Sequence, residues 1–338
     1  MESNSIPKSI KGKLSNDAYI TLFMGIVLVV LFGVACAFVP NFFLPRNMLN
    51  LVTNYWHVII LGIGVTFLLI TGNFDMSVSG VIAMSGVLSV YFCQSPNGGM
   101  ELASGLGMPY GVSVVLTLLC ALVIGGINAF FIARLRVASI IVTLGTMSIA
   151  RGIAQIAALG AQRNTNLTDS FGMIGNAAVP GTAIKLPVLI MAALVLIAVV
   201  IEKKYVFGRR TYLIGANMEA ARLSGVKVER HLTLLYLMSA LLAGITGVLM
   251  ASEYKAGLSN RALGYEFDAL VIALLGGTSI SGGFGSVLGT VIGALILSVV
   301  TSAATGLLLS PDWQFLIKGI VTFLAILAQG IALNRRKG

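Results

Sequence analysis

The stretch HLTLLYLMSALLAGITGVLMA, His231–Ala251, decides the fold because it contains no Asp, Glu, Lys or Arg. As a helix, an apolar segment of about 20 residues is long enough to cross the ~30 Å hydrocarbon core of a bilayer. No water satisfies backbone amides inside that core, so a single segment crosses it as a helix. The stretch therefore predicts a membrane-spanning helix over residues 231–251.

Apolar runs of similar length recur on both sides of this stretch. The chain of 338 residues is 57% hydrophobic and 10% charged, with a mean hydropathy of +0.96. A soluble domain would need far more surface charge. We therefore predict an all-α polytopic membrane protein, a single transmembrane domain over residues 1–338 with a tail over 1–17. About ten transmembrane helices are expected, over residues 18–39, 54–71, 76–93, 110–133, 137–159, 186–201, 231–251, 266–279, 285–305 and 313–332.

The basic residues are distributed unevenly between these runs. The net charge of +10 forms no continuous stripe, which argues against nucleic-acid binding. With the N-terminus inside, the inner segments hold fifteen Lys and Arg, and the outer segments hold five: Arg46, Arg163, Lys185, Lys255 and Arg261. Positive residues concentrate in cytoplasmic segments. Both termini and the largest inner loop, 202–230, are therefore predicted to be cytoplasmic.

This polar loop contains the pattern of a short helix. Asn217 suits the N-cap, Glu219 places negative charge in the first turn, and Gly225 fits the C′ position after the helix. An apolar side is supplied by Met218, Ala221 and Leu223. From these residues alone, two roles are open. The helix either fixes two spans at the surface or engages a partner protein.

Glycines near the C-terminal end of the chain favour packing over chemistry. Gly285, Gly289 and Gly293 recur at every fourth residue, a spacing that lets helix backbones approach closely. A phosphate-binding loop would need a Lys after its glycines, and none follows those of 276–289. The sequence also contains no catalytic set and no metal-ligand spacing. We therefore expect no catalytic residue, metal or cofactor in this chain.

Polar residues within the apolar runs are candidates for a solute pathway. Arg151 is predicted to lie in the outer half of its span, where exposure to lipid would cost on the order of 3 kcal/mol. Arg151 either faces the pathway or ties helices together through carbonyl groups. Lys318 is the second basic residue within a span, and its side chain could extend to the interface instead of facing the bundle. Asp75 is either an N-cap of the next helix or part of a discontinuous helix beside the pathway. The candidate pathway residues are Asp75, Ser77, Thr143, Thr146 and Arg151.

Four blocks together resemble the permeases of bacterial ATP-binding-cassette importers. Glu219-Ala220-Ala221 with Gly225 resembles their EAA-xxx-G signature. Three further blocks are similar to the ribose-type sugar branch: Asn73–Gly80, Ile141–Met147 continuing to Arg151-Gly152, and Gly276–Gly285 continuing to Gly289-Thr290. The chain departs from the branch's pattern at Asn73, Phe74 and Met76, which makes the particular sugar harder to infer.

The resemblance implies a set of partners and a role for the polar loop. A coupling helix would dock into a separate ATPase subunit, which would bind ATP and Mg. An external solute-binding protein would deliver a sugar, and two permease copies or a paralogous pair would form the pathway in the bacterial cytoplasmic (inner) membrane. The ATPase-coupling residues implied are Gly215, Asn217, Glu219, Ala220, Ala221 and Gly225.

Three other functions are weighed against a sugar importer. A related branch imports nucleosides, so that substrate remains an alternative. An ion-coupled carrier commonly needs intramembrane carboxylates, whereas Glu202, Glu219 and Glu229 lie in the polar loop. A membrane-embedded enzyme would need a catalytic set. The importer is therefore the favoured interpretation.

Overall fold

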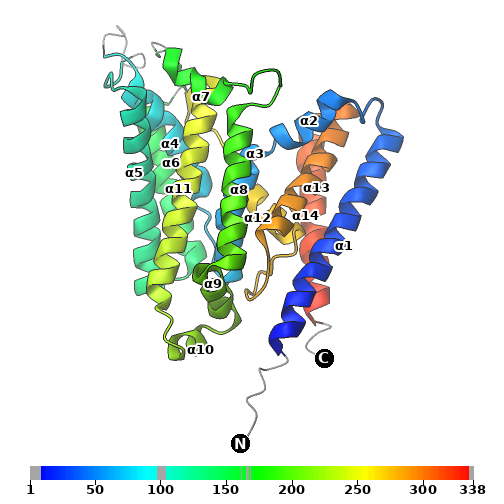
Figure 1. The fold of residues 1–338 in the computed structure, drawn as a ribbon. Coiled ribbons are helices and arrows are strands. Elements are labelled where there is room, and N and C mark those ends of the chain that lie inside the picture. The colour runs from blue at the N-terminus through cyan, green and yellow to red at the C-terminus, as the bar shows by residue number, and fades with distance from the viewer. Residues whose placement is uncertain (1–8, 97–103, 161, 165–166, 168, 335–338) are drawn as a thin grey trace, which may run out of the picture.

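The computed structural model describes residues 9–96, 104–160, 162–164, 167 and 169–334. These residues form a bundle of long helices (Figure 1). Its α-helices are α1 (Ser9–Phe38), α2 (Pro45–Thr53), α3 (Trp56–Ile70), α4 (Val78–Cys93), α5 (Tyr110–Ala129), α6 (Ser139–Ala157), α7 (Met173–Asn176), α8 (Leu186–Lys204), α9 (Val206–Ala216), α10 (Met218–Leu223), α11 (Val228–Tyr254), α12 (Tyr265–Leu275), α13 (Val287–Gly306) and α14 (Pro311–Asn334). A π-helix, η2 (Phe130–Arg134), extends α5, and a 3₁₀ turn, η3 (Asp169–Gly172), precedes α7. Two short strands, β1 (Gln162–Arg163) and β2 (Gly257–Leu258), pair antiparallel.

A helix occupies each of the segments predicted to span the membrane. Among the described residues, six helical segments are long and apolar enough to cross: Pro45–Ile70, Tyr110–Arg134, Ser139–Ala157, Leu186–Lys204, Val228–Tyr254 and Val287–Gly306. Two shorter apolar helices cover Leu22–Phe38 and Val78–Cys93. The helical multi-pass class is thus confirmed. The count of ten crossings stays a prediction.

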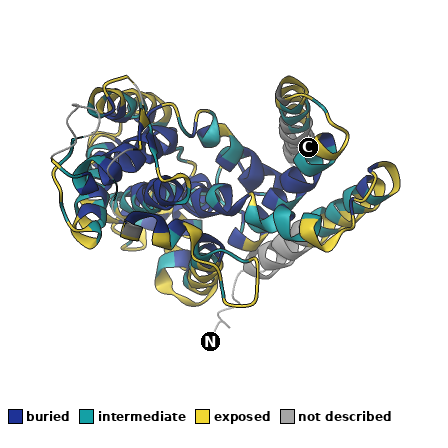
Figure 2. Cartoon of the chain, turned by 90° about the horizontal axis from the view of Figure 1, so that it is seen from above, coloured by how far each residue is buried: buried dark blue, intermediate teal, exposed yellow. Residues whose placement is uncertain are grey.

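The centre of the bundle is made by α3, α4 and α11. Every residue of α3 from Val58 to Ile70 is buried, as is every residue of α4 from Val78 to Val90. Figure 2 shows this buried centre and the exposed outer sides of the surrounding helices. On α6, Ile141 is 68% exposed. A surface in contact with lipid requires apolar side chains, because hydrocarbon offers polar groups no hydrogen-bond partners.

Two loops that each join consecutive helices lie against each other, since a Cβ on Gly282 would lie 3.0 Å from the amide nitrogen of Gly72. The loop 71–77 joins α3 to α4, and the loop 276–286 joins α12 to α13. The amide of Gly283 donates to the carbonyl of Ile70 at 2.9 Å, and the hydroxyls of Thr66 and Thr290 lie 2.5 Å apart. These contacts bring segments far apart in the sequence side by side in the core.

The polar loop 202–230 is more ordered than the single short helix that the sequence predicts. It holds the end of α8, all of α9 and α10, and the start of α11. Three positions of α9, Gly208, Thr211 and Ile214, are buried on one side of that helix. The α9 helix was missed because its Arg and Gly residues conceal a narrow buried stripe. The described ends of α1 and α14 reach the same end of the bundle as α10 (Figure 1), which we name the α10 end.

Candidate functional site

The helix α10 begins where the sequence predicts, with Asn217 as its N-cap. The Asn217 side-chain oxygen accepts a hydrogen bond from the Ala220 amide at 3.0 Å. Arg222, in the last turn, pairs with Glu219 at 3.0 Å and with Glu229 of α11 at 3.2 Å. The second ion pair fixes α10 to the start of the following long helix. Because both pairs are partly solvated, each contributes only a fraction of a kcal/mol to about 1 kcal/mol.

The other end of α10 is closed by Gly225 in the predicted C′ position. Its φ is +81°, in the left-handed region that favours glycine. The amide of Gly225 donates to the carbonyl of Arg222 at 2.9 Å, and the amide of Val226 donates to the carbonyl of Ala221 at 3.0 Å. This pair of bonds is the Schellman motif. The short helix therefore has defined ends on both sides.

The predicted apolar side of α10 is divided between two environments. Ala221 is 3% exposed, so its methyl group packs against the chain itself. This corrects the expectation that Ala221 presents its side chain to a partner protein. Leu223 is instead 90% exposed and the Glu219 side chain is 75% exposed. The outward surface of α10 is thus carried by Glu219, the exposed Ala220 and Leu223.

Gly215, at the end of α9, lies against the bundle instead of facing outward. A Cβ added there would lie 1.7 Å from the carbonyl oxygen of Ile70 and 2.7 Å from the amide nitrogen of Gly283. Only glycine allows the backbone of α9 to approach the end of α3 so closely. The family resemblance implies that Gly215 belongs with the residues that contact the ATPase. The structure places it at an internal contact.

A buried polar network joins four segments near the end of α3. The Asp75 carboxyl accepts hydrogen bonds from the Ser77 amide at 2.9 Å, the Ser77 hydroxyl at 2.5 Å and the Ser239 hydroxyl at 2.7 Å. The Ser77 hydroxyl accepts from the Asn128 side chain at 2.9 Å, and the Asn128 oxygen accepts from the Thr146 hydroxyl at 2.6 Å. These five residues come from the loop 71–77, α5, α6 and α11, and all are buried. We name them the Asp75 network.

The Asp75 network unites three predicted pathway residues with two that sequence reasoning missed. Asn128 and Ser239 were missed because one polar residue within an apolar run has no spacing that marks its partners. The hydrogen bonds within the network satisfy the Asp75 carboxyl on both oxygens. In this structure the network therefore holds helices together.

The remaining two pathway candidates lie outside this network. The Thr143 hydroxyl donates to the carbonyl of Ser139 on its own helix at 2.8 Å. The Arg151 guanidinium donates to the carbonyls of Ser259 at 3.1 Å and Arg261 at 3.3 Å. Arg151 thus ties α6 to the loop between α11 and α12. These contacts agree with the carbonyl tie that its position allows, and a role in the pathway stays a prediction.

Lys318 forms an ion pair within the chain. Its ammonium lies 2.9 Å from the Asp268 carboxylate, which joins α14 to α12. Lys318 thus has a partner on α12, and its extension to the interface stays a prediction. Because both side chains are largely buried, removing either partner would leave the other charge poorly solvated.

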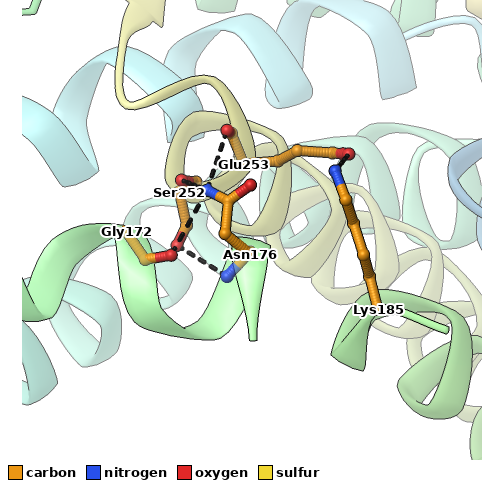
Figure 3. A network of polar contacts seen from close by, with 6 residues as sticks. Gly172, Asn176, Lys185, Ser252 and Glu253 are labelled. Carbon is orange, nitrogen blue, oxygen red and sulfur yellow. Dashed lines mark hydrogen bonds and ion pairs between the residues drawn. The ribbon is translucent and has the colours of Figure 1, made fainter. Parts of the chain in front are cut away.

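At the opposite end of the bundle (Figure 1), the short helix α7 packs against the last turn of α11 (Figure 3). The Asn176 side chain donates to the carbonyls of Gly172 at 3.3 Å, Ser252 at 3.2 Å and Glu253 at 3.0 Å. Lys185 pairs with Glu253 at 2.7 Å. Carbonyls in the last turn of a helix lack a full set of partners within it, and Asn176 supplies donors to two of them at the end of α11.

The predicted glycine packing occurs between α12 and α13. A Cβ at Gly289 would lie 2.2 Å from the carbonyl oxygen of Gly276, and one at Gly293 would lie 2.0 Å from that of Ile272. Gly285 departs from the prediction because α13 begins at Val287. Gly285 lies in the preceding loop with a φ of +146°. Its role is to let that loop turn, and of the three predicted packing glycines only Gly289 and Gly293 lie on α13.

Fold and site together define a class of protein. Apolar helices long enough to cross a bilayer surround a buried polar network, and a capped polar helix lies at one end. Within the part of the chain that the structure describes, no cluster of three or more His, Cys, Asp or Glu could hold a metal ion. The molecule is a multi-pass membrane protein with a buried polar network between its helices.

The family assignment follows from residues 47–326. They match the family described as the permease component of branched-chain amino acid transport systems. The chain belongs to this family, and it is therefore a transport component rather than an enzyme.

Individual relatives extend the match over most of the chain. The ribose import permease protein RbsC of Escherichia coli (strain K12) is 31% identical over 305 residues, covering 89% of this chain and 91% of the relative. The galactose/methyl galactoside import permease protein MglC of the same strain is 31% identical over 319 residues, covering 92% and 94%. RbsC of Bacillus subtilis (strain 168) is 32% identical over 317 residues, covering 93% and 92%. No solved structure matches the chain.

Proposed function

We propose that this chain is the membrane-spanning permease of an ATP-driven importer that carries a sugar across the bacterial cytoplasmic membrane. One observation carries the proposal: the chain aligns over about nine-tenths of its length with permeases named for the import of ribose and galactose. The resemblance of Glu219–Gly225 to the coupling signature supports ATP as the energy source. The chain itself would bind no nucleotide. A partner ATPase would supply the hydrolysis.

The partners follow from the same proposal. An external solute-binding protein delivers the sugar, a second permease copy or a paralogue completes the pathway, and the ATPase docks at the α10 end. The outward surface of α10 supports this docking because Leu223 is 90% exposed beside charged neighbours. Its side chain is therefore available for contact with a partner protein.

Uptake in reconstituted vesicles tests the function and its substrate. The chain is reconstituted with a partner ATPase and a solute-binding protein, and labelled ribose, galactose, uridine and leucine are supplied outside the vesicles. ATP-dependent accumulation of ribose or galactose supports the proposal. Uridine uptake would assign the nucleoside alternative, and leucine uptake would assign the branched-chain amino acids in the family's description. Accumulation that follows an ion gradient without ATP would overturn the importer.

The orientation of the chain is tested with single cysteines. Arg210 lies on α9, and Thr182 lies in the loop after α7; both are exposed. Each is replaced by Cys in a chain whose three native cysteines, Cys36, Cys93 and Cys120, are changed to Ala. An impermeant thiol reagent applied to intact cells should label position 182 and leave position 210 unlabelled. The reverse pattern would place α10 and the ends of α1 and α14 outside.

A further inference from the structure

The buried carboxylate of Glu202 lies at the junction of α8 with the polar loop. Glu202 is 6% exposed, although it precedes the exposed Lys203 and Lys204. One of its oxygens accepts a hydrogen bond from the Tyr212 hydroxyl of α9 at 2.8 Å. The other accepts from the amide of Val287, the first residue of α13, at 2.9 Å. A single carboxylate thus bridges α8, α9 and the start of α13.

The Tyr212 hydroxyl makes a second contact with the same region. It lies 2.6 Å from the carbonyl oxygen of Gly285, in the loop that precedes α13. A phenol has one proton, so the hydroxyl shares it between the Glu202 carboxylate and the Gly285 carbonyl. Hydrogen bonds to an ionised group are shorter and stronger than neutral ones. Through its hydroxyl, Tyr212 therefore holds α9 to the loop 276–286.

The corner between α8 and α9 and the far end of α9 are equally close-packed. A Cβ on Gly208 would lie 2.1 Å from the carbonyl oxygen of Glu202, and one on Gly215 would lie 1.7 Å from that of Ile70. The loop 276–286 also contacts this far end, because a Cβ on Gly215 would lie 2.7 Å from the amide nitrogen of Gly283, which itself donates to the Ile70 carbonyl at 2.9 Å. The α9 helix thus has backbone contacts at both ends and little freedom to move alone.

The linker between α9 and α10 is short. Asn217 is the only residue between the two helices, and its side chain caps α10. A displacement of α10 therefore reaches α9 directly. From α9 it reaches the loop 276–286 through Tyr212 and Gly215. That loop leads into α13, whose first amide is held by Glu202.

We propose that Glu202 and Tyr212 are positioning residues that transmit movement of α10 to the loop 276–286 and the start of α13. The inference rests on the proposed function, because it assumes that a partner ATPase moves α10. It adds the route by which that movement enters the bundle. A carboxylate suits this position because it complements the partial positive charge at a helix N-terminus. It also accepts two donors from different helices at once.

The test measures coupling in the complete transporter. The chain is reconstituted in vesicles with its ATPase and binding protein, and the ATP hydrolysed per sugar transported is compared among variants. Tyr212→Phe removes the hydroxyl and keeps the ring, and Glu202→Gln keeps the shape and removes the charge. Tyr205→Phe, at an exposed tyrosine of the same corner, is the matched control. Copurification of the ATPase and thermal stability of the complex are measured in parallel.

We expect Tyr212→Phe and Glu202→Gln to copurify with the ATPase as the wild type does. The ATP hydrolysed per sugar transported should rise by about tenfold or more, as the loss of a hydrogen bond to a charged group allows. Tyr205→Phe should leave this ratio unchanged. A Tyr212→Phe transporter with the wild-type ratio would overturn the proposal. So would a ratio that stays constant while thermal stability and transport fall together, because the contact would then be purely structural.

Failure of the proposed function gives a different result. In that case the wild-type chain itself neither copurifies with the ATPase nor accumulates sugar. Where Glu202→Gln prevents assembly, Tyr212→Phe decides alone, since it deletes one oxygen atom. The two readouts therefore separate an incorrect function from an incorrect route of coupling.

Discussion

Replacing Asp75 with Ala gives the sharpest test of the Asp75 network. The carboxyl accepts hydrogen bonds from the Ser77 amide, the Ser77 hydroxyl and the Ser239 hydroxyl, all of them buried. Alanine removes both acceptor oxygens and leaves the three donors in place. The neighbouring hydroxyls can rotate toward other oxygens, whereas the Ser77 amide is fixed by the backbone and cannot.

The expected loss of stability follows from which groups stay unsatisfied. Each buried donor left without a partner costs about 1–3 kcal/mol. One orphaned amide and the partial loss of two hydroxyl contacts give an expected destabilisation of about 2–4 kcal/mol. Asp75→Asn keeps one oxygen for the Ser77 contacts and places an amide toward Ser239. Its cost should therefore be smaller, about 1–2 kcal/mol.

Steric trapping of a doubly biotinylated chain in bicelles measures these differences as free energies of unfolding. Ser148→Ala is the control, because its exposed hydroxyl bonds only to the Leu144 carbonyl among the contacts that the structure shows. We expect that control to stay within about 0.5 kcal/mol of the wild type. An Asp75→Ala variant that loses less than about 1 kcal/mol would refute the reasoning. The network would then contribute nothing beyond ordinary packing.

Three further substitutions test single contacts. Gly215→Ala should destabilise the chain by more than about 2 kcal/mol in the same assay, because its methyl group would overlap the Ile70 carbonyl; unchanged stability would contradict this packing. Gly225→Ala should cost about 1 kcal/mol and speed amide exchange within α10, because the residue has a φ of +81°; unaltered exchange would show that the cap does not hold the helix. Arg151→Leu should lower stability by about 1–3 kcal/mol through loss of two carbonyl contacts, and wild-type stability in thermal unfolding would argue against that tie.

Local signals in the sequence predict the helices and the ends of α10. Hydropathy locates the spans because each is a continuous apolar run such as 231–251. Asn217 and Gly225 are recognisable because a cap acts on residues three or four positions away. Their roles therefore follow from spacing along one short segment. The structure shows both caps as the spacing predicts.

Contacts between distant segments escape such reasoning. Asn128 lies 51 residues from Ser77, and Ser239 lies 164 residues from Asp75, so no local pattern connects them. Ala221 was assigned to the outward side of α10 because a two-turn helix gives too few positions to fix its orientation. Its burial depends on how α10 is turned against the rest of the chain. That orientation is a tertiary property.

The position of α9 explains why the polar loop 202–230 is both hydrophilic and rigid. A loop that only connected two spans would tolerate insertions and variable backbone geometry. Here Gly208 and Gly215 bring the backbone of α9 against that of α8 and α3, where a single added methyl group would overlap a carbonyl oxygen. The Glu202 carboxylate and the Tyr212 hydroxyl then hold the same helix to the start of α13. Polar side chains keep α10 in water, while glycine packing and buried hydrogen bonds fix α9 to the bundle. A segment built in this way passes a displacement inward instead of absorbing it.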